Sequence, residues 1–140
     1  MKGGTSRTGL GHIVFGVKTE NLPFYKDLMA FLGWNTIFAM DEGFGGVNKD
    51  GISFWFGNQA NDVSNDYDGP GVNHIAINVE SQSDVDATVA YLQEHGVSPL
   101  FDTPRHRPDF PQGEGQTYYQ VMFETPDRIL IEVVNIGPKS

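Results

Sequence analysis

The sequence predicts an α+β fold made of two βαβββ modules, and three observations support this prediction. Residues 11–17 (GHIVFGV) and 73–79 (NHIAINV) repeat each other, with histidine, isoleucine and valine at matching places. A helical pattern follows each repeat and ends at a glycine, Gly33 or Gly96. Each half then turns through an aspartate, Asp50 or Asp127, into an apolar run. Such a repeat indicates one supersecondary unit that is used twice.

The first half shows the expected order of one strand, one helix and three strands. Residues 11–18 are apolar and rich in β-branched side chains, which is typical of a strand. Asn21 can cap the following helix, with Pro23 in its first turn. The apolar residues of this helix form one stripe at helical spacing: Phe24, Leu28, Phe31 and Leu32. Three strands are predicted near 34–40, 43–48 and 52–57.

The second half repeats this order over residues 72–136. A strand over 73–79 precedes a helix of about 82–95, in which Val85, Val89 and Leu92 form the apolar stripe. Three further strands are predicted near 97–101, 117–124 and 128–135. The first module then spans about 9–57, and the polar segment 58–71 links the two modules. We expect the whole chain, 1–140, to form a single domain.

The second half is longer than the first because of one segment, residues 102–115. His12 and Asp50 are 38 positions apart, whereas His74 and Asp127 are 53 apart. Three prolines and two glycines in residues 102–115 predict an irregular loop. Long loops in compact domains are often functional, and this one carries Arg105, His106, Arg107 and Phe110. A lid over a binding site and a plain surface loop both remain open.

Composition excludes several classes of partner. The net charge is −9 and the basic residues form no cluster, so we expect neither nucleic acid nor an anionic membrane surface as a partner. No apolar stretch approaches the length of a membrane span, and no signal peptide is evident. The chain has no cysteine, which excludes disulfides and thiolate metal ligands. These features suit a cytoplasmic protein.

Several motifs resemble the vicinal oxygen chelate superfamily. They are the histidines that open the repeats, the helix motifs FYKDL (24–28) and LGW (32–34), and the segment YYQVMFETPDRILIE (118–132). Members of this superfamily include glyoxalase I, type I extradiol dioxygenases, fosfomycin-modifying enzymes and bleomycin-resistance proteins. The resemblance covers roughly residues 9–136 and implies that the two modules form a cupped mixed sheet. Family members pair modules within one chain or between two, and we expect a homodimer.

The resemblance also implies a metal site. In that superfamily the first and last strands of each module offer ligands, and His12, His74 and Glu132 match three of these positions. The fourth position carries Trp55, which argues against a four-ligand lyase site like that of glyoxalase I. Two histidines and a carboxylate can hold a divalent ion, with Fe²⁺, Mn²⁺, Ni²⁺, Co²⁺ and Zn²⁺ all possible. A structural role remains the alternative, in which Glu132 faces solvent on an edge strand.

Other candidate residues follow from strand alternation and from the resemblance. Tyr118 can donate a proton or a hydrogen bond to a bound oxyanion, and with Glu132 it is a candidate catalytic residue. The candidates for substrate binding lie on the same strand faces or in the loop 102–115: Ser53, Trp55, Asn78, Arg105, His106, Gln120 and Met122. His95 ends the second helix, where a structural role is expected.

Three functions are consistent with the sequence. The first is a divalent-metal-dependent enzyme, resembling dioxygenases, lyases or isomerases, that acts on a small substrate chelating the metal through oxygens. The second is a metal-free binding or sequestering protein that resembles the bleomycin-resistance members. The third is a thiol transferase for an epoxide antibiotic, which would need a cationic cluster; only Arg105, Arg107 and Arg128 could supply one.

Overall fold

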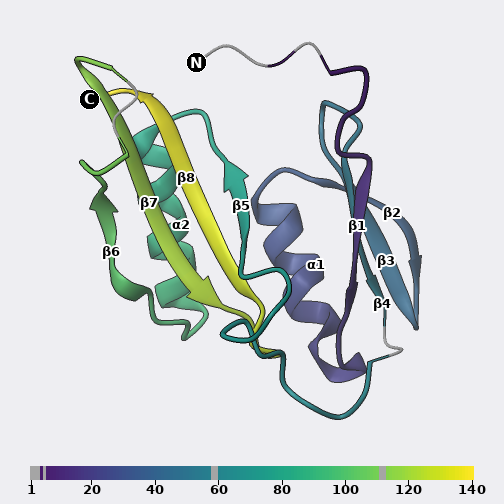
Figure 1. Cartoon of the computed structure of the whole chain (residues 1–140). Helices are drawn as coiled ribbons and strands as arrows, with labels where there is room; N and C mark the ends of the chain where they lie inside the picture. The colour runs from purple at the N-terminus through teal and green to yellow at the C-terminus, as the bar shows by residue number, and fades with distance from the viewer. Residues whose placement is uncertain (1–3, 5, 58–59, 111–112) are drawn as a thin grey trace. The chain divides into compact units, whose positions relative to one another are not determined.

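The computed structural model describes residues 4, 6–57, 60–110 and 113–140. It contains two compact units, Lys2–Ser64 and Asn65–Ser140, and each unit packs one α-helix against a four-stranded mixed sheet (Figure 1). The predicted pair of βαβββ modules is therefore confirmed. No helix in the described residues has the length and apolar character needed to cross a bilayer. Asn58, at the start of the expected linker, lies outside the described residues, as do Pro111 and Gln112 of the expected loop.

The N-terminal unit contains four strands in the order β1-β4-β3-β2. Strand β1 runs parallel to β4, and the other neighbours are antiparallel. His12 opens β1, as the repeat predicts. The elements are β1 (His12–Gly16), the short 3₁₀ helix η1 (Thr19–Asn21), α1 (Leu22–Phe31), β2 (Asn35–Met40), β3 (Gly43–Val47) and β4 (Ser53–Gly57).

Helix α1 begins as predicted, but it buries a different stripe. Asn21 occupies the N-cap position without a side-chain capping hydrogen bond, because the chain enters α1 through the 3₁₀ turn. Of the predicted stripe only Leu28 is fully buried, while Phe31 is 40% exposed. Tyr25 and Met29 fill the interface instead, at the helical spacing of Leu28. The Tyr25 ring stacks on Phe56 of β4 at 4.8 Å, which sets the rotation of the helix.

The sheet face opposite α1 carries Trp55. Alternation along β4 directs Phe54 and Phe56 toward the buried side and leaves Trp55 on the other. The Trp55 ring lies against β3, where a Cβ at Gly45 would come within 2.9 Å of it. Phe38 stacks with the same ring at 5.7 Å. Gly45 thus provides the space that the indole occupies.

Replacing Gly45 by alanine should therefore disturb Trp55. The new methyl group must displace the indole or Ile37, an overpacking that costs about 1–3 kcal/mol of unfolding free energy. Gly46→Ala is the matched control, because its Cβ would meet only ordinary contacts, the nearest at 3.5 Å. Denaturant unfolding and tryptophan emission measure the effect. Equal stability and equal emission in the two variants would contradict this packing.

The C-terminal unit repeats the architecture with strand order β5-β8-β7-β6. Strand β5 is parallel to β8, and the remaining neighbours are antiparallel. Ser81 caps the helix by accepting a hydrogen bond from the Asp84 amide. In the core of this unit the helix packs against one face of β7 and β8. The buried side chains there are Val85, Leu92, Val121, Phe123 and Val133. The elements are β5 (Ile75–Asn78), α2 (Gln82–Glu94), β6 (Leu100–His106), β7 (Gln116–Glu124) and β8 (Leu130–Pro138).

Strand β6 differs from its prediction. We expected a strand near 97–101 and an irregular loop from 102, but β6 extends to His106 and includes a cis Thr103–Pro104 bond. The strand tolerates Pro104 because β6 lies at the sheet edge and its pairing with β7 is interrupted between Leu100 and Arg105. The expected loop thus begins as a strand, and its irregular part follows His106.

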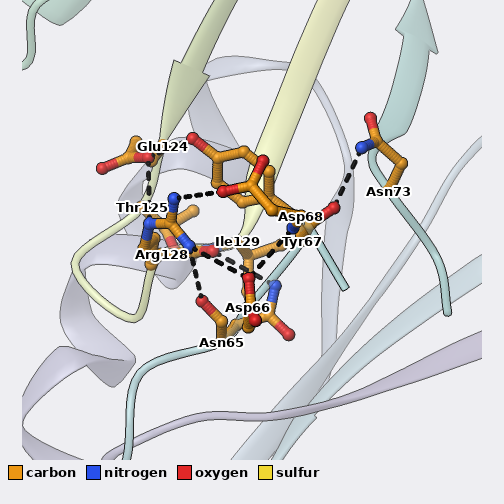
Figure 2. Close-up of polar contacts among 9 residues, drawn as sticks. All are labelled: Asn65, Asp66, Tyr67, Asp68, Asn73, Glu124, Thr125, Arg128 and Ile129. Atoms are coloured by element: carbon orange, nitrogen blue, oxygen red, sulfur yellow. Dashed lines mark hydrogen bonds and ion pairs between the residues drawn. The ribbon is translucent and has the colours of Figure 1, made fainter. Parts of the chain in front are cut away.

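Residues 65–68 of the expected linker belong to the C-terminal unit, where Arg128 holds them (Figure 2). The guanidinium lies 3.6 Å from Asp66 and 3.0 Å from Asp68, and it also donates to the Asn65 carbonyl. It stacks over the Tyr67 ring at 4.2 Å. The Tyr67 hydroxyl donates to Glu124 at 2.5 Å, and Glu124 is itself 3.6 Å from Arg128. One cation therefore joins the segment before β5 to the turn between β7 and β8.

Arg128→Met should loosen this segment. The substitution removes the charge that offsets three carboxylates, so thermal unfolding should begin a few degrees lower at low ionic strength. The difference should shrink in about 0.5 M NaCl, where exposed charges are screened. Arg105→Met, at an exposed cation of the same unit, serves as the control. A salt-independent difference would point to lost packing on Tyr67 rather than lost charge.

Candidate functional site

A polar cluster lies on the face of the C-terminal sheet that points away from α2. Glu132 of β8 pairs with Met122 of β7, and Gln120 pairs with Val134, so these residues share that face. Tyr118 lies two positions before Gln120 on the same side. A polar residue at the position of Glu132 is unusual because its neighbours Ile131 and Val133 on β8 and its partner Met122 on β7 are buried and apolar.

Glu132 is the centre of this cluster and is only 1% exposed. Its Oε2 atom accepts a hydrogen bond from the Tyr118 hydroxyl at 2.8 Å and another from the Gln120 side-chain amide. Its Oε1 atom lies 3.4 Å from Nε2 of His74. Two donors on one oxygen thus orient the carboxylate so that the other oxygen faces the histidine. The alternative in which Glu132 faces solvent does not hold.

His74 immediately precedes β5 rather than opening it, and Asn73 determines the orientation of its ring. The Asn73 amide nitrogen donates to the Tyr67 carbonyl at 3.0 Å, which turns the amide oxygen toward Nδ1 of His74 at 2.8 Å. Because an amide oxygen only accepts, Nδ1 carries the proton. In the neutral ring Nε2 then has a free lone pair, and it faces Glu132.

The environment of Tyr118 keeps its hydroxyl group protonated. Partial burial and the hydrogen bond to Glu132 raise the pKa of Tyr118 to about 12. The hydroxyl therefore stays protonated at neutral pH and acts as a donor. Its ring packs against Phe110 at 5.3 Å, so a residue of the segment after β6 covers part of this side chain.

Arg107 reaches the cluster from that same segment. Its Nη1 atom donates to Oε1 of Gln120 at 3.1 Å. Its Nε and Nη2 atoms bind both oxygens of Asp109 at 3.1 and 2.7 Å, and this pairing lowers the pKa of Asp109. From the sequence, Arg107 is expected to be a cation of the loop 102–115, without a defined partner. Its arrangement with Asp109 across a proline, Arg107-Pro108-Asp109, was the available signal for a fixed turn.

The remaining candidates of the C-terminal unit are distributed over both faces of its sheet. Arg105 pairs with Gln120 in the β6–β7 register and is exposed, and Asn78 is exposed opposite Val134. Met122 packs with Tyr67 and Leu130 beside the polar cluster.

His106 lies on the opposite face from Tyr118 and Gln120. Its ring contacts Tyr119 at 4.6 Å, and its Nδ1 atom lies 2.5 Å from the Thr117 hydroxyl. Tyr119 in turn donates to Asp86 of α2, so His106 belongs to the helix side of the sheet. His95 caps α2, with Nδ1 2.8 Å from the Tyr91 carbonyl, as its expected structural role requires.

In the N-terminal unit, three candidates lie on the face that carries Trp55. His12 pairs with Ser53 in the parallel β1–β4 register, and its side chain is exposed. The Ser53 hydroxyl accepts a hydrogen bond from the Trp55 indole at 2.9 Å. Ser53 therefore orients Trp55, in addition to sharing its face.

The donor set of His74 and Glu132 fits a divalent metal ion. An imidazole nitrogen and a carboxylate oxygen suit Mn²⁺, Fe²⁺, Co²⁺, Ni²⁺ and Zn²⁺. Both ligand residues are oriented by further hydrogen bonds, as is usual around metal ligands: His74 donates to Asn73, and Glu132 accepts from Tyr118 and Gln120. Within the residues that the structure describes, no three His, Asp or Glu side chains form a complete metal-binding group.

A family model matches residues 9–133 of the chain, that of the Glyoxalase/Bleomycin resistance protein/Dioxygenase superfamily. No curated protein sequence matches. Solved structures of the same fold are similar over nearly the whole chain. A Bacillus halodurans protein described as a glyoxalase has a TM-score of 0.75 and 23% identity, covering 92% of this chain and 96% of that one.

Two further solved structures are similar in fold. A glyoxalase/dioxygenase from Nostoc punctiforme has a TM-score of 0.68 and 14% identity, covering 99% of this chain and 97% of that one. A variant of the fosfomycin resistance protein FosX from Listeria monocytogenes, complexed with Mn(II) and 1S,2S-dihydroxypropylphosphonic acid, has a TM-score of 0.62 and 19% identity, covering 91% and 90%. With the family match over residues 9–133, the chain belongs to the glyoxalase/bleomycin resistance protein/dioxygenase superfamily, also known as the vicinal oxygen chelate superfamily.

Proposed function

We propose that this protein is a divalent-metal-dependent enzyme that acts on a small substrate chelating the metal through oxygens. The reaction is of the dioxygenase, lyase or isomerase type. The proposed ligands are His74, Glu132 and His12, the last on the strength of its equivalent position in the repeat. The observation that carries the proposal is the buried Glu132 carboxylate, whose Oε1 atom faces Nε2 of His74.

The chemistry of the cluster supports this choice over a purely structural role. A buried carboxylate is costly, and a structural sheet position would be filled more favourably by an apolar side chain. A bound divalent ion would supply a Lewis acid for the oxygens of the substrate. Tyr118 keeps its proton at neutral pH and can hold a negatively charged oxygen by a hydrogen bond. Tyr118 and Glu132 are therefore the proposed catalytic residues.

Substrate contacts are proposed for residues on the same two sheet faces. Gln120, Met122, Asn78 and Arg105 belong to the face of Glu132, and Ser53 and Trp55 to the face of His12. We leave His106 out of this set because its ring packs toward α2. A thiol-transferase function is not favoured, because Arg107 and Arg128 are both engaged by carboxylates.

Metal binding tests the proposal directly. Protein purified without chelator should contain close to one equivalent of a divalent ion, or should show a raised melting temperature on addition of Mn²⁺. His74→Ala and Glu132→Gln should each lower Mn²⁺ affinity by about 10-fold or more, since each removes a ligand. Elemental analysis and calorimetric titration are the measurements.

His95→Ala is the matched control, because His95 caps α2 away from the cluster and should leave metal content unchanged. A wild-type protein that binds none of Mn²⁺, Fe²⁺, Co²⁺, Ni²⁺ or Zn²⁺ would contradict the proposal and favour the alternative.

That alternative is a metal-free small-molecule binding or sequestering protein. One observation favours it: the Trp55 face presents stacked rings of Trp55 and Phe38, and Phe38 is 72% exposed. Aromatic surfaces of this kind bind flat apolar ligands through area and stacking. The polar cluster around Glu132 has no role in such a protein, which is why the enzyme is the main proposal.

We also propose that the protein forms a homodimer through exposed apolar side chains. Val14 of β1 is 67% exposed on the Trp55 face, and Met40 of β2, at the opposite edge of the same sheet, is 64% exposed. Val14→Lys should therefore give a monomer in light scattering, while the wild type gives a dimer. Val63→Lys is the control, since Val63 is equally exposed at 68% but lies outside the strands. A monomeric wild type, or dimeric Val14→Lys, would contradict this assignment.

A further inference from the structure

We infer that Arg107 is a positioning residue for Glu132 and that it acts through the side-chain amide of Gln120. Nothing in the family resemblance assigns Arg107 a role in the site. The inference deepens the proposed function, because the oriented carboxylate is a proposed metal ligand. The orientation itself belongs to the protein and can be measured without any metal.

The argument begins with the direction of the hydrogen bonds. Arg107 donates to Oε1 of Gln120 at 3.1 Å, and the Gln120 amide nitrogen donates to Oε2 of Glu132. A guanidinium only donates and a carboxylate only accepts, so the amide between them fits in one orientation alone. A flipped amide would place donor against donor and acceptor against acceptor. Gln120 is 2% exposed, so solvent offers little compensation for such a flip.

Arg107 is itself held firmly enough to impose this orientation. Asp109 binds the guanidinium through a two-point fork at 3.1 and 2.7 Å. The Arg107 main-chain amide donates to the Tyr118 carbonyl at 2.7 Å, which joins this residue to β7. The guanidinium also lies over the Phe110 ring at 4.7 Å. Its position is therefore set by three contacts that do not involve Gln120.

The consequence for Glu132 follows from its two oxygens. Gln120 and Tyr118 both bind Oε2, which leaves Oε1 toward His74. Without Arg107 the Gln120 amide is held only by its bond to Glu132, so one of the two donors to Oε2 is less firmly fixed. Tyr118 then remains the one firmly placed donor to Oε2, so the geometry toward His74 is imposed less tightly.

This role differs from the two that the sequence left open for Arg107, a residue of a lid over the binding site and a member of a cationic cluster. The Arg107 guanidinium is taken up by Asp109 and Gln120, and its side chain is only 23% exposed. Arg105, by contrast, is exposed on that sheet face.

The first measurement is the side-chain NH₂ signal of Gln120 in a ¹⁵N-correlated NMR spectrum of metal-free protein. Its absence in Gln120→Leu assigns it. In the wild type one of its protons should be shifted downfield by the bond to Glu132, and Arg107→Met should return the pair toward the positions of solvent-exposed amides. Arg7→Met, at an exposed N-terminal arginine, should leave the pair unchanged. Arg107→Ala replaces Arg107→Met if the latter does not fold.

The second measurement is a double-mutant cycle on Mn²⁺ affinity. Arg107→Met should weaken binding by about 10-fold, the lower end of losses seen for outer-shell partners. If Arg107 acts through Gln120, the double variant Arg107→Met/Gln120→Leu should bind no more weakly than Gln120→Leu alone. Arg107→Lys should recover part of the affinity, since it retains one donor.

The outcomes separate this inference from the metal proposal. A shifted Gln120 signal in Arg107→Met, in a protein whose wild type binds no metal, supports the positioning role and contradicts the metal-dependent enzyme. An unchanged Gln120 signal overturns the positioning role, whatever the metal affinity. Additive losses in the double variant also overturn it, because Arg107 would then act by a route that bypasses Gln120.

Discussion

The buried carboxylate of Glu132 is the constraint on which the functional face of the C-terminal unit depends. A charge that is 1% exposed must receive hydrogen bonds from the protein itself, because water cannot provide them. This requirement explains the polar side chains of Tyr118 and Gln120 among buried apolar strand residues. The same requirement applies to the buried Gln120 amide, whose oxygen needs a donor of its own. Arg107 provides that donor.

The two units show how one architecture can support different chemistry. In both, the sheet face toward the helix is packed with apolar side chains, as Phe54 and Phe56 show in one and Val121 and Phe123 in the other. The opposite faces have diverged. Where the C-terminal unit carries Glu132, the N-terminal unit carries Trp55. The Trp55 ring lies against Gly45, and its indole N–H donates a hydrogen bond to the Ser53 hydroxyl. The fold tolerates this exchange because that face does not form the helix–sheet core.

The segment before β5 contributes more to the site than its linker-like composition indicates. Arg128 fixes Asp66 and Asp68, and the Tyr67 carbonyl within that segment orients the Asn73 amide. Asn73 then sets the proton position on His74. A surface ion-pair cluster thus determines, through two hydrogen bonds, which nitrogen of a candidate ligand is free. Surface charges of this kind add little stability individually, but here they act as a network.

The sequence alone determined the repeated βαβββ order and nearly all strand and helix positions. These features can be predicted locally, because the spacing of apolar residues within a short segment distinguishes a strand from a helix. Strand alternation also places Tyr118 and Gln120 on one side of their strand, but only the β7–β8 register shows that Glu132 faces the same side. Tertiary structure decided the rest. Strand β6 incorporates Pro104 because its pairing is interrupted, and this register sends His106 to the helix side. The contact of Arg107 with Gln120 was equally invisible, since this acceptor lies on another strand that only the tertiary structure brings within reach.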